Sequence, residues 1–309
     1  MVRVNQTSSV SEFILLGLSS RTEDQTPLFV LFLTMYLVTI IGNLIIILAI
    51  CSDPQLQTPM YFFLSFLSFT DICFTTNTVP KMLVDFLSEK TISYAGCLKQ
   101  MYLLYAVGNT DSCLLAAMDF GRYVAICDPF HYVTTMSHRL CVLLLAFSCS
   151  FSHIHSLLHI LLLNCLIFCE SNIIHNFICD INPVLKLCCS FTFVNELVIK
   201  TEGLVVLVTP FLFIAFSYAQ ILITVLKIPS AAGKHKAFST CGSHLTVVIL
   251  FYGSIFYVYL QPLSAYTVRD RVAIIVYTVL SSLLNPFIYS LRNKDLKRGL
   301  KKLMDKKQF

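Results

Sequence analysis

The sequence predicts an all-α membrane protein: a bundle of seven transmembrane helices followed by a short C-terminal amphipathic helix. Of the 309 residues, 56% are hydrophobic and only 13% are charged, whereas about 25% of residues are charged in a typical soluble domain. Apolar runs of about 20 residues, the length needed to span a bilayer, can be marked seven times along the chain. A strongly basic segment follows the last run directly, which is typical of the cytoplasmic end of a spanning helix.

The seven predicted spans follow one another in order along the chain. They lie near residues 28–50, 59–80, 98–121, 140–163, 197–226, 238–260 and 272–291. The third and fifth runs are less uniformly apolar than the others. An odd number of spans places the two termini on opposite sides of the membrane. We therefore expect an extracellular N-terminus (1–27), a seven-helix domain (28–291) and a cytoplasmic helix and tail (292–309).

The charge distribution sets the expected orientation. From Arg292 to the end, the chain holds eight Lys or Arg residues and two Asp residues, and such basic residues accumulate on the cytoplasmic side. This predicts a multi-pass protein of the plasma membrane with its C-terminus inside, near anionic lipid. No basic domain suggests nucleic-acid binding. The sequon Asn5-Gln6-Thr7 falls in the outer N-terminus, so Asn5 is a candidate glycosylation site.

The basic segment itself predicts the amphipathic helix, over residues 294–307. At helical spacing one face is apolar and lysines fill the other, which suits a helix lying on the inner leaflet. The apolar face consists of Leu296, Leu300, Leu303 and Met304.

Five cysteines lie near the predicted outer surface. Cys97 is at the outer end of the third span, and the long loop near 164–196 holds Cys169, Cys179, Cys188 and Cys189. In an oxidising compartment such cysteines pair, and four paired cysteines allow three connectivities. The residues alone leave the pairing open, and the alternative is that Cys188 or Cys189 stays a free thiol.

Several polar residues lie within the predicted spans. Asn43, Asp71 and Asn285 interrupt apolar runs, and a polar or ionisable group in hydrocarbon must find a partner. Pro286 removes a backbone donor and kinks its helix. We expect Asn43, Asp71 and Asn285 to form one network near the midplane, either as a purely structural cluster or as an element that switches between two arrangements.

The fourth span contains an unusual group of histidines. His155 and His159 are four residues apart, so they share one helix face, and His153 is close by. This spacing can ligate zinc or copper. Polar groups lining a pocket are the more common result, so we predict His155 as a pocket residue and no metal site.

Five motifs along the chain resemble those of one family. They are Pro59-Met60-Tyr61-Phe62-Phe63-Leu64, Arg122-Tyr123-Val124-Ala125-Ile126-Cys127, Ser217-Tyr218, Lys236-Ala237-Phe238-Ser239-Thr240-Cys241-Gly242-Ser243-His244-Leu245 and Pro286-Phe287-Ile288-Tyr289-Ser290-Leu291-Arg292-Asn293. Their order and the near-complete coverage resemble vertebrate odorant (olfactory) receptors of the tetrapod-type class, which are rhodopsin-like G-protein-coupled receptors. The resemblance implies a non-enzymatic receptor that binds small volatile molecules within the helix bundle. It also implies activation of a stimulatory, olfactory-type G protein that raises cAMP.

The resemblance also implies roles for individual residues. It pairs Cys97 with Cys179, and Cys169 with Cys189. Cys188 stands where the family usually has Ser, so a pairing of Cys97 with Cys189 stays open. It makes Asp71 a candidate sodium site. It assigns activation and coupling to Arg122, Tyr123, Tyr218, His244, Asn285, Pro286 and Tyr289.

Helical spacing then indicates which residues line the pocket. Tyr105, Gly108, Asn109 and Ser112 share one face of the third span, and Tyr252, Phe256 and Tyr259 share a face of the sixth. Val205 and Val206 of the fifth span and Tyr277 and Thr278 of the seventh have a similar outer depth. Such a cavity, apolar with a few hydroxyls and one amide, suits alcohols, aldehydes, ketones or esters. The alternative for each side chain is packing or contact with lipid.

Two positions depart from the family pattern. Where the family usually reads Met-Ala-Tyr-Asp-Arg-Tyr, this chain has Met118-Asp119-Phe120-Gly121-Arg122-Tyr123. Asp119 can pair with Arg122 along the helix, but an exposed pair contributes only a few tenths of a kcal/mol. We therefore expect weaker restraint of Arg122, with raised basal activity or a lower folding yield. Ser282 also replaces a common Pro, so the bend of the seventh helix can differ.

Two alternatives remain at this stage. A transporter or channel would show two related halves with matching broken helices, and no such repeat is visible. A receptor-like chain that reaches the membrane poorly would follow from Gly121 and Ser282. No phosphate-binding loop or other catalytic motif is present, so an enzyme is not expected.

Overall fold

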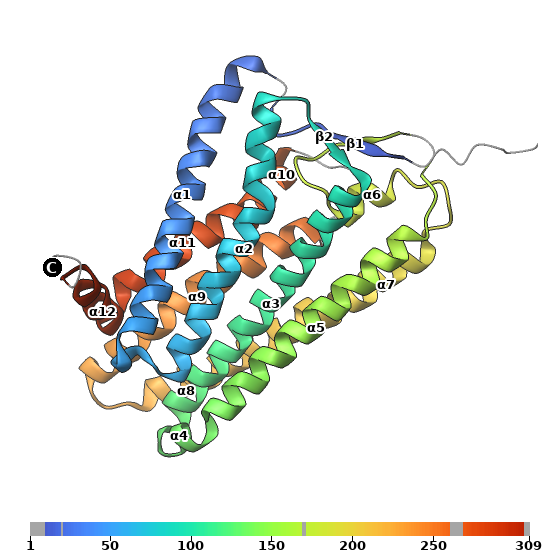
Figure 1. Ribbon diagram of the computed structural model, residues 1–309. Helices are drawn as coiled ribbons and strands as arrows, with labels where there is room; N and C mark the ends of the chain where they lie inside the picture. The colour runs from blue at the N-terminus through green and yellow to red at the C-terminus, as the bar shows by residue number, and fades with distance from the viewer. Residues whose placement is uncertain (1–9, 20, 169–170, 260–267, 306–309) are drawn as a thin grey trace, which may run out of the picture.

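The computed structural model describes residues 10–19, 21–168, 171–259 and 268–305, and within them seven long helical segments form a bundle (Figure 1). The first four are α1 (Thr22–Ser52), α2 (Pro59–Leu87), α3 (Tyr94–Cys127) and α5 (His138–Asn164). The fifth comprises α7 (Phe193–Gly203), η3 (Leu204–Val208) and α8 (Thr209–Lys227), and the sixth is α9 (Ala231–Tyr259). The seventh comprises α10 (Val268–Ile275), η4 (Val276–Leu280) and α11 (Ser281–Arg292), and α12 (Lys294–Asp305) follows. This confirms the predicted seven-helix fold with a C-terminal helix.

The helices differ from the predicted spans in two respects. Several continue beyond the apolar run, as α3 does at both ends, because a helix can extend into the headgroup region once its apolar part has crossed the hydrocarbon. The fifth and seventh segments each contain a π-helical turn, η3 and η4, which the apolar pattern did not predict. A π-turn adds a residue and rotates everything on one side of it relative to the other.

Five of the described helical segments are long and apolar enough, by length and composition, to cross a membrane. The long segments outside this set are α2 and α3, which carry buried polar residues such as Asp71, Asp111 and Asp119. Contacts place α3 at the centre of the bundle, since it packs against α2, α5, α8 and α9. Its polar side chains therefore face other helices, as intramembrane polar residues generally do.

At the outer end, a small three-stranded sheet joins the N-terminal segment to two loops (Figure 1). Strand β1 (Glu12–Leu15) pairs antiparallel with β2 (Thr91–Ser93) and parallel with β3 (Ile173–Ile174), with Glu12 opposite Ser93 and Ile14 opposite Ile173. Alternate β1 side chains, Phe13 and Leu15, are buried, as the two-residue period of a strand requires. The predicted glycosylation site, Asn5, lies outside the described residues.

The disulfide Cys97–Cys179 joins the outer end of α3 to the long loop, so the pairing implied by the resemblance is confirmed and Cys97–Cys189 was wrong. The other implied pairing involves Cys169, which lies outside the described residues. Cys188 is a free thiol whose Sγ donates to the Val184 carbonyl at 3.6 Å. Burial raises the pKa of the Cys188 thiol to about 11, so it stays protonated and unreactive.

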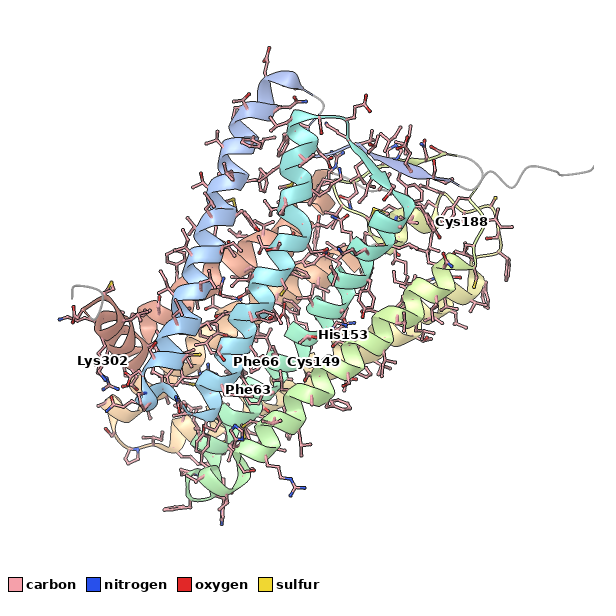
Figure 2. The ribbon with its side chains drawn as sticks, in the orientation of Figure 1. Phe63, Phe66, Cys149, His153, Cys188 and Lys302 are labelled. Carbon is pink, nitrogen blue, oxygen red and sulfur yellow. A yellow bond between two sulfur atoms is a disulfide. The ribbon has the colours of Figure 1, made fainter. Side chains whose placement is uncertain are left out.

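At the inner end, α12 lies against the first inner loop. The Asn293 side chain caps it, because Oδ1 accepts from the Asp295 and Leu296 backbone amides at 3.0 and 3.1 Å and from the Tyr61 hydroxyl at 2.9 Å. Leu296 is fully buried, whereas Lys302 reaches the Asp53 carboxylate at 3.1 Å (Figure 2). The hydrogen bond from Lys302 lowers the pKa of Asp53 below its usual value.

Candidate functional site

A chain of polar contacts connects the outer loop to α3 and α5. The Tyr105 hydroxyl donates to Asp180 Oδ1 at 2.6 Å, and the Tyr105 ring stacks on His159 with centroids 5.9 Å apart. His159 Nε2 is 3.3 Å from His155 Nε2, and His155 Nδ1 is 3.0 Å from Asn109 Nδ2. Asp180 was missed by the sequence reasoning. Its position directly after the disulfide cysteine Cys179 could have indicated it.

The hydrogen bonds fix the tautomers of the two histidines. The Asn109 Nδ2 amide is a donor, so His155 Nδ1 accepts and His155 Nε2 carries the proton. His155 Nε2 therefore donates to His159 Nε2. Within the described part of the chain, no group of three or more His, Cys, Asp or Glu side chains is arranged to hold a metal ion. The third histidine, His153, is exposed on α5 and bonds the Tyr102 hydroxyl at 2.8 Å (Figure 2).

A second cluster, largely aromatic, joins α3 to α8 and α9. The Ser112 hydroxyl and the Tyr252 hydroxyl are 2.7 Å apart. The Tyr252 ring contacts Phe211 and Phe256, with centroids 5.4 and 5.8 Å away, and Phe211 meets Phe256 edge-on at 5.2 Å. Phe211 of α8 was not predicted as a pocket residue. The cluster combines an apolar wall with a buried pair of hydroxyls, the composition that small-molecule sites generally have.

The four α3 residues predicted to share one face contact three different helices. Tyr105 and Asn109 turn toward the α5 histidines, Ser112 turns toward α9, and the position of Gly108 is beside Phe74 of α2, whose ring atoms begin 3.6 Å from where a Cβ would be. Phe74 also contacts the Tyr277 ring at 5.9 Å. The predicted pocket residues of α3 therefore contact α2, α5 and α9, and α3 lies at the centre of the candidate site.

The remaining predicted pocket residues fall into different environments. Val206 and Thr278 are buried, and the Thr278 hydroxyl donates to the Ile274 carbonyl at 2.7 Å. Val205, in contrast, is 62% exposed, so it does not share the buried face of Val206. Both valines lie within the π-helical turn η3, and neighbouring residues on a helix point about 100° apart. The Tyr259 side chain lies outside the described residues.

Two hollows lie outside these two clusters, in the described part of the molecule. One, of about 520 Å³, lies on the side of the bundle between α9 and the α10–η4 segment, where Ile249 and Val272 are largely exposed. A second, of about 10 Å³, is enclosed between Asp71, Asp111 and Asn285.

The midplane polar residues form two contacts that meet at α11. The Asn285 amide donates to both oxygens of Asp71, at 3.1 and 2.8 Å. The Asn43 amide donates to the Ser282 carbonyl at 3.2 Å and to the Thr39 carbonyl at 3.0 Å. Asn43 thus bonds the backbone of α11 and not Asp71 itself. Gly42 packs closely on this helix, since a Cβ there would lie 3.3 Å from the Pro286 ring.

At the inner end, α3, α8 and α9 are joined through Tyr218 and His244. His244 Nε2 is 3.1 Å from the Leu115 carbonyl, so this nitrogen carries the proton and His244 Nδ1 accepts from the Tyr218 hydroxyl at 2.9 Å. The Tyr218 hydroxyl is also 3.1 Å from the Cys241 carbonyl. Arg122, seven residues beyond Leu115 on α3, is buried at the same end. Tyr123 packs beside this group, against Ile221 and Val225.

Comparison with known proteins decides the family. The olfactory receptor family model matches residues 32–307. This chain belongs to the olfactory receptor family. Human olfactory receptor 1L8 is 76% identical over 99% of this chain and 100% of the relative, and human olfactory receptor 1L3 is 73% identical over 96% and 92%.

The solved structure of squid rhodopsin has the same fold. It aligns with a TM-score of 0.73 at 20% identity, covering 92% of this chain and 81% of the rhodopsin. Family membership removes the transporter or channel alternative and makes this olfactory receptor a non-enzymatic, multi-pass membrane receptor.

Proposed function

We propose that this olfactory receptor binds small volatile molecules between α3, α5, α8 and α9 and activates a stimulatory, olfactory-type G protein, raising cAMP. The observation that carries the proposal is a pair of contacts between α3 and α9. Ser112 meets the Tyr252 hydroxyl at 2.7 Å, and three residues further along α3 the Leu115 carbonyl meets His244 Nε2 at 3.1 Å. The first contact belongs to the largely aromatic cluster, which we call the outer cluster. The second belongs to the group around Tyr218 and His244 at the inner end.

The spacing of these contacts gives a route from ligand to inner face. His244 and Tyr252 are eight residues apart on α9, which is about 12 Å along a helix. A ligand hydroxyl or carbonyl that bonds Ser112 or Tyr252 replaces the contact between them and loosens α9 from α3. Because α9 is continuous over this length, that change reaches His244 and Tyr218 as a displacement of one rigid element.

The same residues suggest the chemical class of the ligand. The aromatic wall of Phe211, Tyr252 and Phe256 suits an apolar body, and the Ser112 hydroxyl, the Asn109 amide and His155 offer donors and acceptors for one polar group. The Asp180 carboxylate accepts from the Tyr105 hydroxyl, and none of the residues named in these two sets of contacts is Lys or Arg. Neutral volatile alcohols, aldehydes, ketones and esters fit this composition.

The inner surface offers a docking region for the G protein. Phe130 is 95% exposed and Val133 is largely exposed, and both belong to the second inner loop, in η2 (Pro129–His131) and α4 (Tyr132–Thr135). Exposed apolar side chains at a membrane protein's aqueous face favour a protein partner. The basic residues of α12 at the same end support a cytoplasmic location for it, with the N-terminus outside.

The 10 Å³ cavity supports a sodium ion between Asp71 and Asp111. A space of this size holds about one water-sized particle. Asp111 Oδ1 and Asn285 Oδ1 are buried without a hydrogen-bond partner among the described residues, and carboxylate and amide oxygens suit a hard cation. Replacing sodium by choline should lower the thermal midpoint of the purified receptor, and Asp71→Asn should remove that difference. An equal midpoint in both salts would exclude the ion.

The decisive experiment is cAMP measured in cells that express the tagged receptor with an olfactory-type G protein, against a panel of volatiles, with surface staining in parallel. We expect a dose-dependent rise that Arg122→Ala abolishes. Tyr252→Phe should change odorant potency at least severalfold, because it removes the hydroxyl at the pocket. Tyr257→Phe is the matched control, since Tyr257 lies on the same helix but on its exposed side. No rise despite clear surface staining would contradict the proposal.

A further inference from the structure

Strand β1 is a part of the outer end that no cross-link holds in place. It lies between β2 and β3 at the outer end of the bundle (Figure 1), whereas the disulfide described above joins α3 to the long loop. Backbone hydrogen bonds hold β1 on both sides. The Leu15 amide donates to the Lys90 carbonyl at 2.7 Å, and the Leu16 amide donates to the Ile174 carbonyl at 3.0 Å. The contacts of β1 with its neighbours can therefore open and close.

The buried side of β1 covers the outer end of the proposed ligand site. Phe13 and Leu15 are 1% and 0% exposed, and they belong to the same apolar cluster as Met101 of α3. Tyr105, one turn further along α3, packs against that cluster and donates its hydroxyl to Asp180. β1 thus lies over the chain of polar contacts that begins at Asp180 and continues through Tyr105 to α5.

A turn follows β1, and a basic side chain of the seventh helical segment binds it. Gly17 has a φ of +73°, in the left-handed region that glycine adopts readily. Arg271 of α10 donates from one nitrogen, Nη1, to the Gly17 and Leu18 carbonyls at 3.1 and 3.3 Å. This contact joins the N-terminal segment to α10, although the two are far apart in the sequence.

A second basic side chain binds the same turn from the loop between α2 and β2. Lys90 donates from Nζ to the Leu16 and Ser19 carbonyls at 3.3 and 3.0 Å. A hydrogen bond from a cation to a carbonyl is charge-assisted, which makes it stronger than a neutral one. Lys90 and Arg271 together fix the end of β1 to two different parts of the bundle, the α2 side and the seventh helical segment.

We propose that Lys90 and Arg271 are positioning residues that hold β1 as a lid over the outer end of the ligand site, and that lifting of this lid sets the rate at which an odorant enters and leaves. The ligand in this inference rests on the function proposed above, whereas the lid rests on the contacts of β1. The lid is closed in the free receptor and around the bound ligand, and it opens only for exchange. Loss of either cation favours the open lid and speeds entry and exit by the same factor, which leaves odorant potency unchanged.

Hydrogen–deuterium exchange of the purified receptor tests the lid without any ligand. The bonded amides of β1 exchange when their hydrogen bonds open. Arg271→Gln should therefore speed exchange in β1 about tenfold, the change expected for loss of one charge-assisted hydrogen bond, and Arg271→Lys, which keeps the charge, should stay closer to the wild type. Lys200→Gln is the matched control, because Lys200 is exposed near the outer end of the fifth segment and pairs with Glu196. Unchanged exchange in both Arg271→Gln and Lys90→Gln would overturn the lid.

A second measurement follows the rate of the response. Recruitment of the G protein to the receptor would be recorded in real time after an odorant is added and after it is washed out. Arg271→Gln should shorten both phases severalfold, at unchanged potency and maximal response. A change in potency or maximal response with unchanged rates would make Arg271 a merely structural residue and overturn the proposal. If no volatile recruits the G protein to any receptor, the proposed function fails, and the exchange measurement still decides the lid.

A cross-link tests the opposite direction and covers the case in which Arg271→Gln does not reach the surface. Ile14 and Thr91 are opposite each other in the β1–β2 ladder, next to the hydrogen-bonded pair of Leu15 and Lys90. A non-hydrogen-bonded pair of this kind brings the two Cα atoms to about 4.5 Å, which a disulfide can span. The double variant Ile14→Cys, Thr91→Cys should respond more slowly than either single variant. A mild reductant should restore the rate, because the native disulfide is fully buried and is reduced last. Equal rates in the cross-linked, single and reduced receptors would overturn the proposal.

Discussion

The two ends of the bundle are held together by different kinds of contact. At the outer end, three strands form a sheet, and the Cys97–Cys179 disulfide bonds α3 covalently to the long loop. At the inner end, α12 is held through the Lys302–Asp53 ion pair and through the packing of Gly299 against Leu56. A disulfide does not open on the timescale of receptor motion, whereas packing and ion pairs do. The difference fits a fixed end beside the proposed ligand site and an adjustable end beside the proposed docking region for the G protein.

Removing the disulfide should have the largest effect on this contrast. The two cysteines are 82 residues apart in the sequence, and loss of a native disulfide typically costs about 2–5 kcal/mol. We expect the double variant Cys97→Ser, Cys179→Ser to lose most surface staining and to unfold at a lower temperature. Cys188→Ser is the matched control, because Cys188 is a free thiol of the same loop. Equal loss in both variants would mean that any change in this loop destabilises the outer end, and that the disulfide contributes no stability of its own.

A glycine pair tests the inner end with a smaller expected effect. A Cβ at Gly299 would lie 2.6 Å from Leu56 Cδ1, whereas a Cβ at Gly253 would meet nothing within 4 Å. Ala improves helix propensity by about 1 kcal/mol at either position, so the difference between Gly299→Ala and Gly253→Ala isolates the clash. Overpacking of this kind costs about 1–3 kcal/mol.

We expect Gly299→Ala to lower the thermal midpoint relative to Gly253→Ala and to reduce the maximal cAMP response. Odorant potency should stay the same, because α12 is remote from the outer cluster. A change in potency equal to the change in maximal response would contradict the separation of the two ends.

The sequence predicted the bundle because the observations behind it are local. A run of about 20 apolar residues spans a bilayer whatever it packs against, and a basic segment marks the inner side. The alternate burial of Phe13 and Leu15 could not be predicted, because the exposed residue between them, Ile14, is apolar as well. The sheet depends on β2 and β3, which are distant in the sequence.

The candidate site was predicted less completely. Val205 and Val206 were chosen by depth alone, and neighbouring residues on a helix point about 100° apart, so both could not face the same buried side. Val205 is accordingly 62% exposed. Asp180 and Phe211 escaped prediction because their importance comes from contacts with Tyr105 and Tyr252 on other elements. The Asp71–Asn285 contact was expected from the cost of polar groups in hydrocarbon, which applies wherever they meet.

The smallest effect should come from the ion pair at the inner end. Lys302 donates to Asp53 and reaches Gln55 at 3.5 Å, but its side chain is 48% exposed, and exposed pairs are weak and screened by salt. We expect Lys302→Gln to reduce the maximal cAMP response slightly, and high salt to reduce the thermal midpoint of the wild type more than that of the variant. Lys297→Gln is the control, because Lys297 is exposed on the same helix. Equal effects of the two variants would assign the result to the total charge of α12 and its attraction to lipid.

The direction of the pH dependence follows from Asp53. Lys302 lowers the pKa of this carboxyl below its usual 3.8, so the folded state binds the proton less readily than the unfolded state does. The contribution of the pair to stability is therefore complete above the usual pKa and is lost as the pH falls through the lowered value. Mild acidification from neutral pH should leave α12 attached and the response of Lys302→Gln parallel to that of the wild type. If the two responses diverge near pH 6, a group other than Asp53 controls the inner end.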